Sequence, residues 1–290
     1  MSSSPAIGFI GTGRVANTLA RALHGAGYRV TALASRTLES AARLAQAVPG
    51  ARAYRTQQEV VDASELVFLT VPDDAIAPLV ASLAWRADMA VVHCSGATEL
   101  GALEPARRAG ARTGAFHPLH AFADPLVALA NLPGCAVAIE AEEPLYGELE
   151  TMARALRLEP LHLPPGTRAI YHLSGSFAAS FIDGLLHEAA ELWRTRLGVP
   201  REQALKALLP LAYATLDSVA KMGTVEALTG PVSRGDAGTV ARHLDALRRD
   251  HPRTYALYVQ LARRSLAMAI ERGTLTEAQR AALTELLGKE

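Results

Sequence analysis

The feature that constrains this chain most is a glycine-rich turn near residue 11. An apolar run, Ala6-Ile7-Gly8-Phe9-Ile10, ends at Gly11-Thr12-Gly13-Arg14-Val15-Ala16, and helical spacing follows from Thr18 to Gly25. Gly11 allows a tight turn from strand to helix, Gly13 allows a diphosphate to approach the backbone, and Ala16 allows the helix to lie against a sheet. The free N–H groups at the helix start favour an anion. The turn therefore predicts a dinucleotide-binding unit whose phosphate contacts come from Gly11, Thr12, Gly13, Arg14, Val15 and Ala16.

Short apolar runs alternate with helical stretches over the first half of the chain. The later strand candidates are residues 28–34, 66–71, 90–94, 136–139 and 160–163. Because these runs are mostly apolar without alternation, we expect a mostly parallel sheet with helices on both faces. After Pro164-Pro165-Gly166 the spacing becomes helical, and the expected helices are 169–196, 201–222, 239–250, 253–272 and 276–287. The sequence therefore predicts a Rossmann-like, doubly wound α/β domain over residues 1–165 and an all-helical domain over residues 166–290.

Composition excludes several classes of protein. Lysine plus arginine and aspartate plus glutamate each number 29, so the net charge is zero, whereas a nucleic-acid binder normally has a basic excess. Two cysteines, Cys94 and Cys135, support neither a disulfide scaffold nor a cysteine-rich zinc site. No secretory leader pattern and no apolar run of about 18 residues is present. We expect a cytoplasmic protein that binds a small molecule, and neither nucleic acid nor membrane.

The end of the second predicted strand indicates which dinucleotide binds. An NAD site usually places a carboxylate there, about 20 residues after the glycines, to bind the ribose 2′-hydroxyl. This chain has Ser35 and Arg36, which stand 22 and 23 residues after Gly13. A hydroxyl and a guanidinium suit a 2′-phosphate, and Arg14 adds charge. We therefore predict NADP rather than NAD, although a solvated surface charge is the other interpretation of Arg36.

Three further segments follow predicted strands at the carboxyl edge of the sheet. Val71 and Pro72 are expected to border the cofactor, and Ser95 to contact the nicotinamide ribose or the substrate. His117 is a candidate acid or base because imidazole titrates near neutral pH. A histidine held by backbone hydrogen bonds in a loop is the alternative for His117. No carboxylate or cysteine cluster accompanies it, so we expect no metal site.

The first predicted helix of the second domain carries polar side chains on one face. His172, Ser176, Ser180 and Asp183 are spaced by 4, 4 and 3 residues. This stripe lines a substrate cleft if it faces the sheet edge, and has no such role if it faces solvent. On the first interpretation His172 and Ser176 join His117 and Ser95 as candidate catalytic residues, and Ser180 is a candidate substrate contact.

A loop rich in glycine, proline and hydroxyl groups covers residues 228–236, and long loops of this kind are commonly functional. Thr229 and Arg234 are its candidate substrate-binding residues. Arg234 suits a substrate carboxylate, which it can bind with two parallel hydrogen bonds. It is equally suited to pair with Asp236 and brace the loop, and both interpretations stay open.

These segments together resemble the family that joins a Rossmann-like NADP-binding domain to a C-terminal DUF2520 domain. The matching stretches are 8–15, 71–76, 93–96, 117–119, 171–172 and 228–236. The chain departs from the family pattern at Ser180 and near Ser218, where asparagine is usual. More distantly it is similar to pyrroline-5-carboxylate reductases, ketopantoate reductases and prephenate dehydrogenases. His117-Pro118 is similar to the His-Pro pair of the last group, in which the histidine acts on the substrate hydroxyl.

The resemblance implies a reductase with its substrate between two domains and a homodimer built through the helical half. We therefore predict an NADP-dependent oxidoreductase that transfers hydride between the nicotinamide and a small carbonyl or imine acid. A non-catalytic NADP(H)-binding sensor or interaction protein is the alternative, because no residue pattern in the chain requires catalysis.

Overall fold

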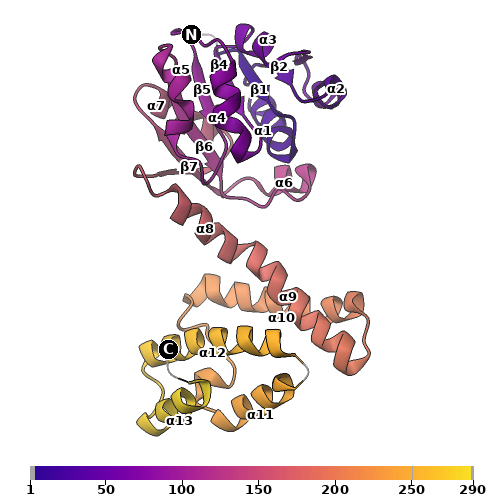
Figure 1. Cartoon of the computed structure of the whole chain (residues 1–290), viewed down its shortest axis with the longest axis vertical. Helices are drawn as coiled ribbons and strands as arrows, with labels where there is room; N and C mark the ends of the chain where they lie inside the picture. The colour runs from indigo at the N-terminus through magenta and orange to yellow at the C-terminus, as the bar shows by residue number, and fades with distance from the viewer. Residues whose placement is uncertain (1–3, 250, 289–290) are drawn as a thin grey trace. The chain divides into compact units, whose positions relative to one another are not determined.

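The computed structural model describes residues 4–249 and 251–288. It divides into two compact units, the first ending at Ser180 and the second beginning at Phe181 (Figure 1). The sequence prediction placed this division at residues 165 and 166. The difference is helix α8 (Arg168–Ala178), which belongs to the first unit because Arg168 and Tyr171 are buried there.

The first unit is built on one sheet of eight strands. In order across the sheet they are β3 (Arg52–Ala53), β2 (Val30–Ala34), β1 (Ile7–Ile10), β4 (Leu66–Leu69), β5 (Ala90–His93), β6 (Arg112–Pro118), β7 (Ala136–Ala141) and β8 (Glu159–His162). Neighbouring strands from β3 to β6 pair in parallel, β7 is antiparallel to β6, and β8 is parallel to β7. The predicted Rossmann-like, mostly parallel sheet is confirmed. The carboxyl ends of β1, β4, β5 and β6 therefore meet at one edge, where ligands bind in such folds.

Helices cover both faces of this sheet. They are α1 (Arg14–Gly25), α2 (Leu38–Gln46), α3 (Gln57–Asp62), α4 (Asp73–Ser82), the 3-10 turn η1 (Leu100–Leu103), α5 (Glu104–Arg108), α6 (Pro125–Asn131) and α7 (Leu145–Ala155). Phe9 belongs to the core cluster that includes side chains of α1, α2 and α7. Its neighbour Ile10 belongs to the opposite cluster, with side chains of α3 and α4. Burial on both faces explains why the strand sequences are almost uninterrupted apolar runs.

Strand β6 is the longest strand that was not predicted from the sequence. The prediction treated residues 116–120 as a loop, but Phe116, His117 and Pro118 belong to β6. The segment contains Gly114 and Pro118, which are unfavourable in isolated strands. Pairing with both β5 and β7 makes it a strand, and this pairing places His117 opposite Ala138 at the functional edge of the sheet.

The second unit is helical, as predicted. It contains α9 (Ser180–Leu192, whose first residue closes the first unit), the π-helical turn η2 (Trp193–Leu197), α10 (Arg201–Met222), the 3-10 turn η3 (Val232–Arg234), α11 (Ala237–Arg248), α12 (Pro252–Arg272) and α13 (Glu277–Leu287). The single helix expected over residues 169–196 is interrupted at Ala179, whose backbone (φ −129°, ψ −86°) is not helical. Within the described ranges, no helix combines the length and apolarity needed to cross a bilayer.

Candidate functional site

The turn between β1 and α1 has room for glycine alone at Gly11. Its φ is +98°, and a Cβ atom there would stand 2.6 Å from the carbonyl oxygen of Thr70. The Thr70 hydroxyl donates to the carbonyl oxygen of Gly11 (2.8 Å), and the Gly11 N–H donates to Ala34 (2.9 Å). These contacts fix the turn between the ends of β2 and β4. They also place Val71 beside the turn, because a Cβ atom at Gly11 would be 3.0 Å from the backbone nitrogen of Val71.

The start of α1 differs from those of α2 and α3. Helices α2 and α3 are capped by the side chains of Thr37 and Thr56, whereas Gly13 at the start of α1 provides no side-chain cap. The first turn of α1 has no acidic residue, and a Cβ atom at Gly13 would meet nothing within 4 Å. Ala16 is buried in the core. The first amides of α1 therefore lack a side-chain acceptor, and an anion can approach them closely.

A group of polar side chains joins this turn to the start of α2. The Thr12 and Ser40 hydroxyls are 2.8 Å apart, although they are 28 residues apart in sequence. Ser35 and Arg36 lie between β2 and α2, where Ser35 is half-buried and Arg36 is exposed. The nearest acidic side chain in sequence, Glu39, pairs with Arg43 at 2.8 Å. Sequence reasoning did not single out Ser40, because only the folded chain brings it to Thr12.

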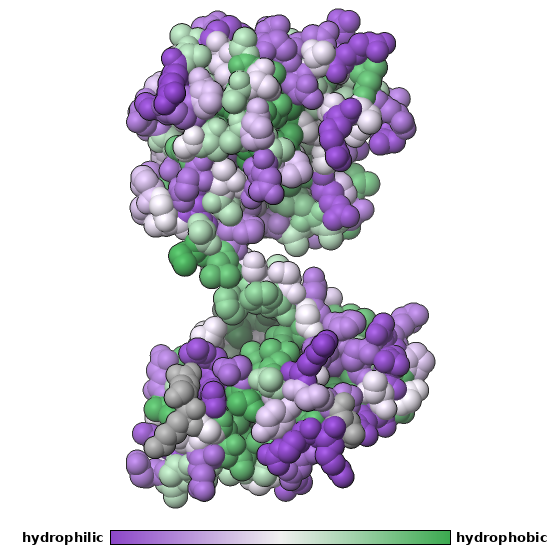
Figure 2. Space-filling view, viewed as in Figure 1, coloured by the Kyte–Doolittle hydropathy of each residue, from purple (hydrophilic) through white to green (hydrophobic). Residues whose placement is uncertain are grey.

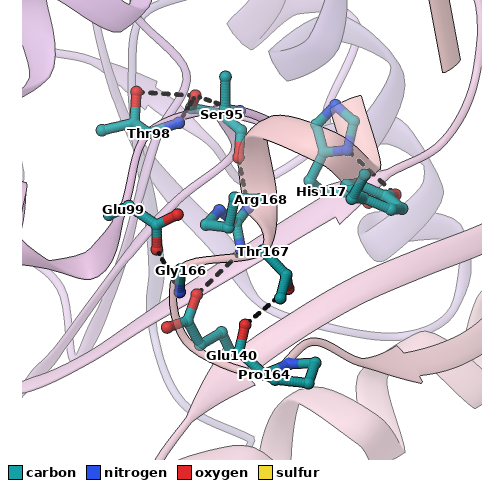
Figure 3. A network of polar contacts seen from close by, with 11 residues as sticks. Ser95, Thr98, Glu99, His117, Glu140, Pro164, Gly166, Thr167 and Arg168 are labelled. Atoms are coloured by element: carbon teal, nitrogen blue, oxygen red, sulfur yellow. Dashed lines mark hydrogen bonds and ion pairs between the residues drawn. The ribbon is translucent and has the colours of Figure 1, made fainter. Parts of the chain in front are cut away.

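At the same sheet edge, a buried arginine joins three segments of the first unit. Arg168 of α8 has no exposed surface; its Nη1 lies 3.3 Å from Glu140 Oε2 on β7. Its Nη2 donates to the carbonyl oxygen of Ser95 at 2.5 Å, after β5 (Figure 3). The sequence analysis missed Arg168 and Glu140. A usable signal was the spacing, because Arg168 stands three and four residues before Tyr171 and His172, on the same helix face.

The hydroxyl of Ser95 is used within its own turn. It donates to Thr98 Oγ1 at 2.9 Å and accepts from the N–H groups of Ala97 and Thr98 at 3.2 and 2.9 Å (Figure 3). Ser95 is also buried. Because its single hydrogen is donated to Thr98, the hydroxyl stabilises the connection between β5 and η1 in this structure. The predicted contacts of Ser95 with cofactor and substrate stay predictions that would require this turn to rearrange.

His117 is held by Tyr171. The phenol oxygen of Tyr171 lies 3.2 Å from Nδ1 of His117 and donates to the backbone oxygen of the same residue at 3.2 Å. The ring of His172 lies edge-on to that of His117, with their centroids 5.9 Å apart. A Cβ atom at Gly96 would stand 2.5 Å from His172 and 2.8 Å from His117, so glycine makes room for both rings.

Burial changes the protonation of the groups around His117. Burial, together with the charges of Arg168 and His172, lowers the pKa of His117 to about 4. Burial is the largest cause that lowers the pKa of His93 to about 3, and the charges of Arg168 and His117 act in the same direction. Neither ring nitrogen of His93 has a hydrogen-bond partner. Burial raises the pKa of Tyr171 to about 12. His117 is therefore neutral at pH 7.

A cavity of about 470 Å³ opens beside this histidine pair within the first unit. Its lining combines imidazole and hydroxyl groups with small apolar residues, and comprises His117, Leu119, His120, Ala121, His172, Gly175, Ser176, Ala178, Ala179 and Ser180. The volume suits a small organic molecule. The structure thus brings together His117, His172, Ser176 and Ser180, whose catalytic and substrate-binding roles stay predictions.

The remaining predicted substrate residues belong to the second unit. Thr229 and Arg234 are both exposed, and the Arg234 carbonyl accepts from the side chain of Gln279 at 3.1 Å. Asp236 caps α11 by accepting from the backbone and hydroxyl of Thr239 at 2.9 and 2.6 Å. Neither substrate role is tested by these contacts. Over the described parts of the chain, no group of three or more His, Cys, Asp and Glu side chains is arranged to hold a metal ion.

Comparison with solved structures extends over almost the whole chain. A proposed NADP oxidoreductase from Bacteroides fragilis is 28% identical, with a TM-score of 0.74 over 91% of this chain and 98% of that one. A 1-pyrroline-5-carboxylate reductase from Streptococcus pyogenes is 15% identical, with a TM-score of 0.63 over 92% and 99%. A reductive aminase from Aspergillus terreus, in complex with NADPH and ethyl-5-oxohexanoate, is 16% identical, with a TM-score of 0.61 over 98% and 93%. The last two similarities show the shared fold.

Comparison of sequences assigns the two halves of the chain to different domain families. No curated protein matches the chain. Residues 2–118 match the family model of the Rossmann-like domain, and residues 135–265 match DUF2520, described as a domain of unknown function. The chain therefore carries a Rossmann-like domain followed by a DUF2520 domain.

Proposed function

We propose that this protein is an NADP-dependent oxidoreductase that acts on a small carbonyl or imine acid in the cavity beside His117 and His172. The observation that carries the proposal is the uncapped start of α1 behind Gly11 and Gly13, on the same sheet edge as the histidine pair. That edge is where a Rossmann-like sheet binds its ligands. Structural neighbours described as an NADP oxidoreductase and an NADPH complex support the choice of cofactor.

The residues present fit a dinucleotide phosphate. The amides from Gly11 to Ala16 would hold the diphosphate, and Val71 and Pro72 would border the bound cofactor. Ser35 and Arg36 would hold the 2′-phosphate, with Arg14, Thr12 and Ser40 nearby in the sequence or the fold. When bound, the nicotinamide supplies or accepts a hydride, and the protein holds the substrate and manages its protons.

The cofactor preference can be tested at Arg36. Arg36→Ala removes a charge-assisted contact to the 2′-phosphate, which costs about 1.4–3 kcal/mol of binding free energy. We therefore expect NADPH affinity to fall about 10- to 100-fold. The affinity for NADH should stay unchanged. Titration of nicotinamide fluorescence measures both. Arg43→Ala is the matched control, because Arg43 lies on α2, the helix that follows Arg36, and pairs with Glu39. Equal losses for both nucleotides would assign Arg36 no role at the 2′-phosphate.

Turnover separates an enzyme from a binding protein. Purified protein with NADPH would be mixed with a panel of small 2-oxo acids and cyclic imine acids, and oxidation followed by nicotinamide absorbance. We expect oxidation with at least one compound and none with Gly13→Ala, whose methyl group would obstruct the diphosphate without touching the fold. Tight NADPH binding without oxidation across the panel would instead favour a sensor.

A homodimer through the helical half is the partner arrangement we propose. Helix α10 has 22 residues, of which only Ala204 is buried in the single chain. Leu211, Tyr213, Leu216 and Met222 of α10 are exposed, and the space-filling view shows apolar side chains on the second unit (Figure 2). Exposed apolar surface of this extent is typical of an interface. The family resemblance implies a homodimer through the helical half, so a second copy is the occupant that we expect.

The dimer can be tested by placing a charge on α10. Wild-type protein should have twice the chain mass of 30.7 kDa in size-exclusion chromatography with light scattering, whereas Leu211→Lys should shift toward a single chain. Lys206→Ala, an exposed position on the same helix that pairs with Glu202, is the control and should leave the mass unchanged. A wild-type protein of one chain mass at micromolar concentration would disprove the assembly.

A further inference from the structure

We infer that His117 meets the substrate as a hydrogen-bond acceptor, held in that state by Tyr171. The cavity therefore takes a substrate whose reacting nitrogen or oxygen carries a hydrogen, such as a hydroxy acid, an amino acid or a protonated imine. The substrate class inferred here rests on the proposed function, whereas the protonation state of His117 does not. The inference assigns Tyr171, which the sequence analysis did not select, as a positioning residue.

The hydrogen bonds of Tyr171 determine which nitrogen of His117 carries the proton. The phenol has one hydrogen, and two atoms of His117 lie 3.2 Å from its oxygen. The backbone oxygen can only accept, so the phenol hydrogen goes there. The contact with Nδ1 is then a hydrogen bond only if Nδ1–H donates to the phenol oxygen. If the phenol donated to Nδ1 instead, the phenol oxygen and the backbone oxygen of His117 would face each other as two acceptors with no hydrogen between them. Nδ1 therefore carries the hydrogen, and Nε2 carries a lone pair.

The lone pair of Nε2 lies on the side of the ring away from Tyr171. Nε2 and Cε1 approach Gly96, where a Cβ atom would be 2.8 Å from each of them. The ring lines the cavity together with His172 and Ser176. Because Nδ1 is turned to Tyr171, Nε2 is the ring nitrogen of His117 that is left to accept a hydrogen bond from a substrate.

The charged groups around His117 keep it from taking a second proton. Arg168 and His172 of α8 disfavour an imidazolium at His117, and His117 in turn disfavours one at His93 of β5. The carboxylate of Glu140 is turned to Arg168, and no residue that lines the cavity is acidic. Burial acts in the same direction and lowers the pKa of His117 to about 4. At pH 7 the ring therefore has no proton to give at Nε2.

This state of His117 selects among the possible reactions. Reduction of a neutral carbonyl consumes one hydride and one proton, and His117 cannot supply that proton. Reduction of a protonated imine consumes only a hydride, because the nitrogen already holds its proton. In the reverse direction, an alcohol or amine loses a hydride from carbon and a proton from its oxygen or nitrogen. An acceptor at Nε2 suits both of the last two cases, because it orients the X–H bond, and the proton released in the reverse direction goes to solvent.

Nitrogen NMR tests the state of His117 without any turnover. Protein labelled with ¹⁵N-histidine would be recorded by long-range proton–nitrogen correlation from pH 8 to pH 5, with the His117 signals identified by their loss in His117→Gln. We expect a protonated Nδ1 and an unprotonated Nε2 throughout. In Tyr171→Phe the two nitrogens should lose this difference, and in the control Tyr146→Phe they should keep it. A protonated Nε2 at pH 7, or a titration above pH 6, would overturn the inference.

Matched substrates test the consequence for the reaction. One carbon skeleton would be offered as ketone and cyclic imine with NADPH, and as alcohol and amine with NADP⁺. We expect imine reduction or alcohol or amine oxidation to exceed ketone reduction, and Tyr171→Phe to lower kcat/KM about tenfold or more while NADPH affinity is kept. Ketone reduction that is lost in His117→Gln and declines as pH rises through 6–7 would overturn the inference. Absence of all turnover would reject the proposed function, while the NMR result would still decide the state of His117.

Discussion

Acidification from pH 6.5 to pH 4.5 is expected to destabilise the first unit by several kcal/mol. Burial holds the pKa of His93 at about 3 and that of His117 at about 4, against 6.5 for an ordinary histidine. Below pH 6.5 both histidines become protonated in the unfolded chain, whereas in the folded unit they stay neutral until the pH reaches about 4 and about 3. The stabilisation is therefore complete above pH 6.5 and is lost as the pH falls toward 4. Each histidine contributes about 1.4 kcal/mol per pH unit in this window, so the pair contributes about 5 kcal/mol over two units.

The measurement uses the two tryptophans of the chain. Trp85 is buried in the first unit and Trp193 belongs to the second, so a Trp193→Phe background reports on the first unit alone. Urea denaturation between pH 7 and pH 4.5 then gives the slope of stability against pH. His93→Phe should reduce this slope by about half without loss of stability at pH 7, because no hydrogen bond is removed.

His162→Gln, at an exposed position on β8, is the matched control for the acid prediction and should leave the slope unchanged. An equal slope in wild type and His93→Phe would show that His93 takes up its proton in the folded unit. The burial of the His93 ring would then be wrong.

Arg168→Met is expected to destabilise the first unit by about 3–5 kcal/mol, the usual result of breaking a buried ion pair. The substitution leaves Glu140 buried without a partner and removes the donor from the Ser95 carbonyl. The double variant Arg168→Met with Glu140→Leu should recover most of this loss, because no isolated charge remains. Urea denaturation with Trp85 as the reporter measures these two variants and Glu140→Leu alone, and the three differences from wild type form a double-mutant cycle.

An exposed pair provides the matched control for Arg168. Arg112 and Glu148 are 2.6 Å apart but partly exposed, so Arg112→Met should change the stability by about 1 kcal/mol or less. Equal effects at Arg112 and Arg168 would contradict the buried pair, as would a double variant no more stable than Arg168→Met. The recovered double variant should still bind NADPH, since Arg168 lies outside the glycine turn.

Much of the fold follows from local patterns. The bounds of α10 agree with the helix expected over residues 201–222, and Thr276 and Gln279 form the capping box typical of a helix start. The strands β1, β4 and β5 were found because each is an unbroken apolar run. Such patterns act within a few residues, so they can be read without knowing what lies across the sheet.

The sequence by itself determined the glycine turn. The backbone conformation at Gly11 requires a residue without a side chain, and so does the free approach to α1 at Gly13. The absence of a side chain at both positions is visible in the sequence. The tertiary structure alone decided the surroundings of His117. Ser95, Glu140 and Arg168 lie up to 73 residues apart, and their contact depends on the pairing of β6 with β5 and β7. A buried charge is stable only where such distant partners meet, so its role cannot be read from the residues beside it.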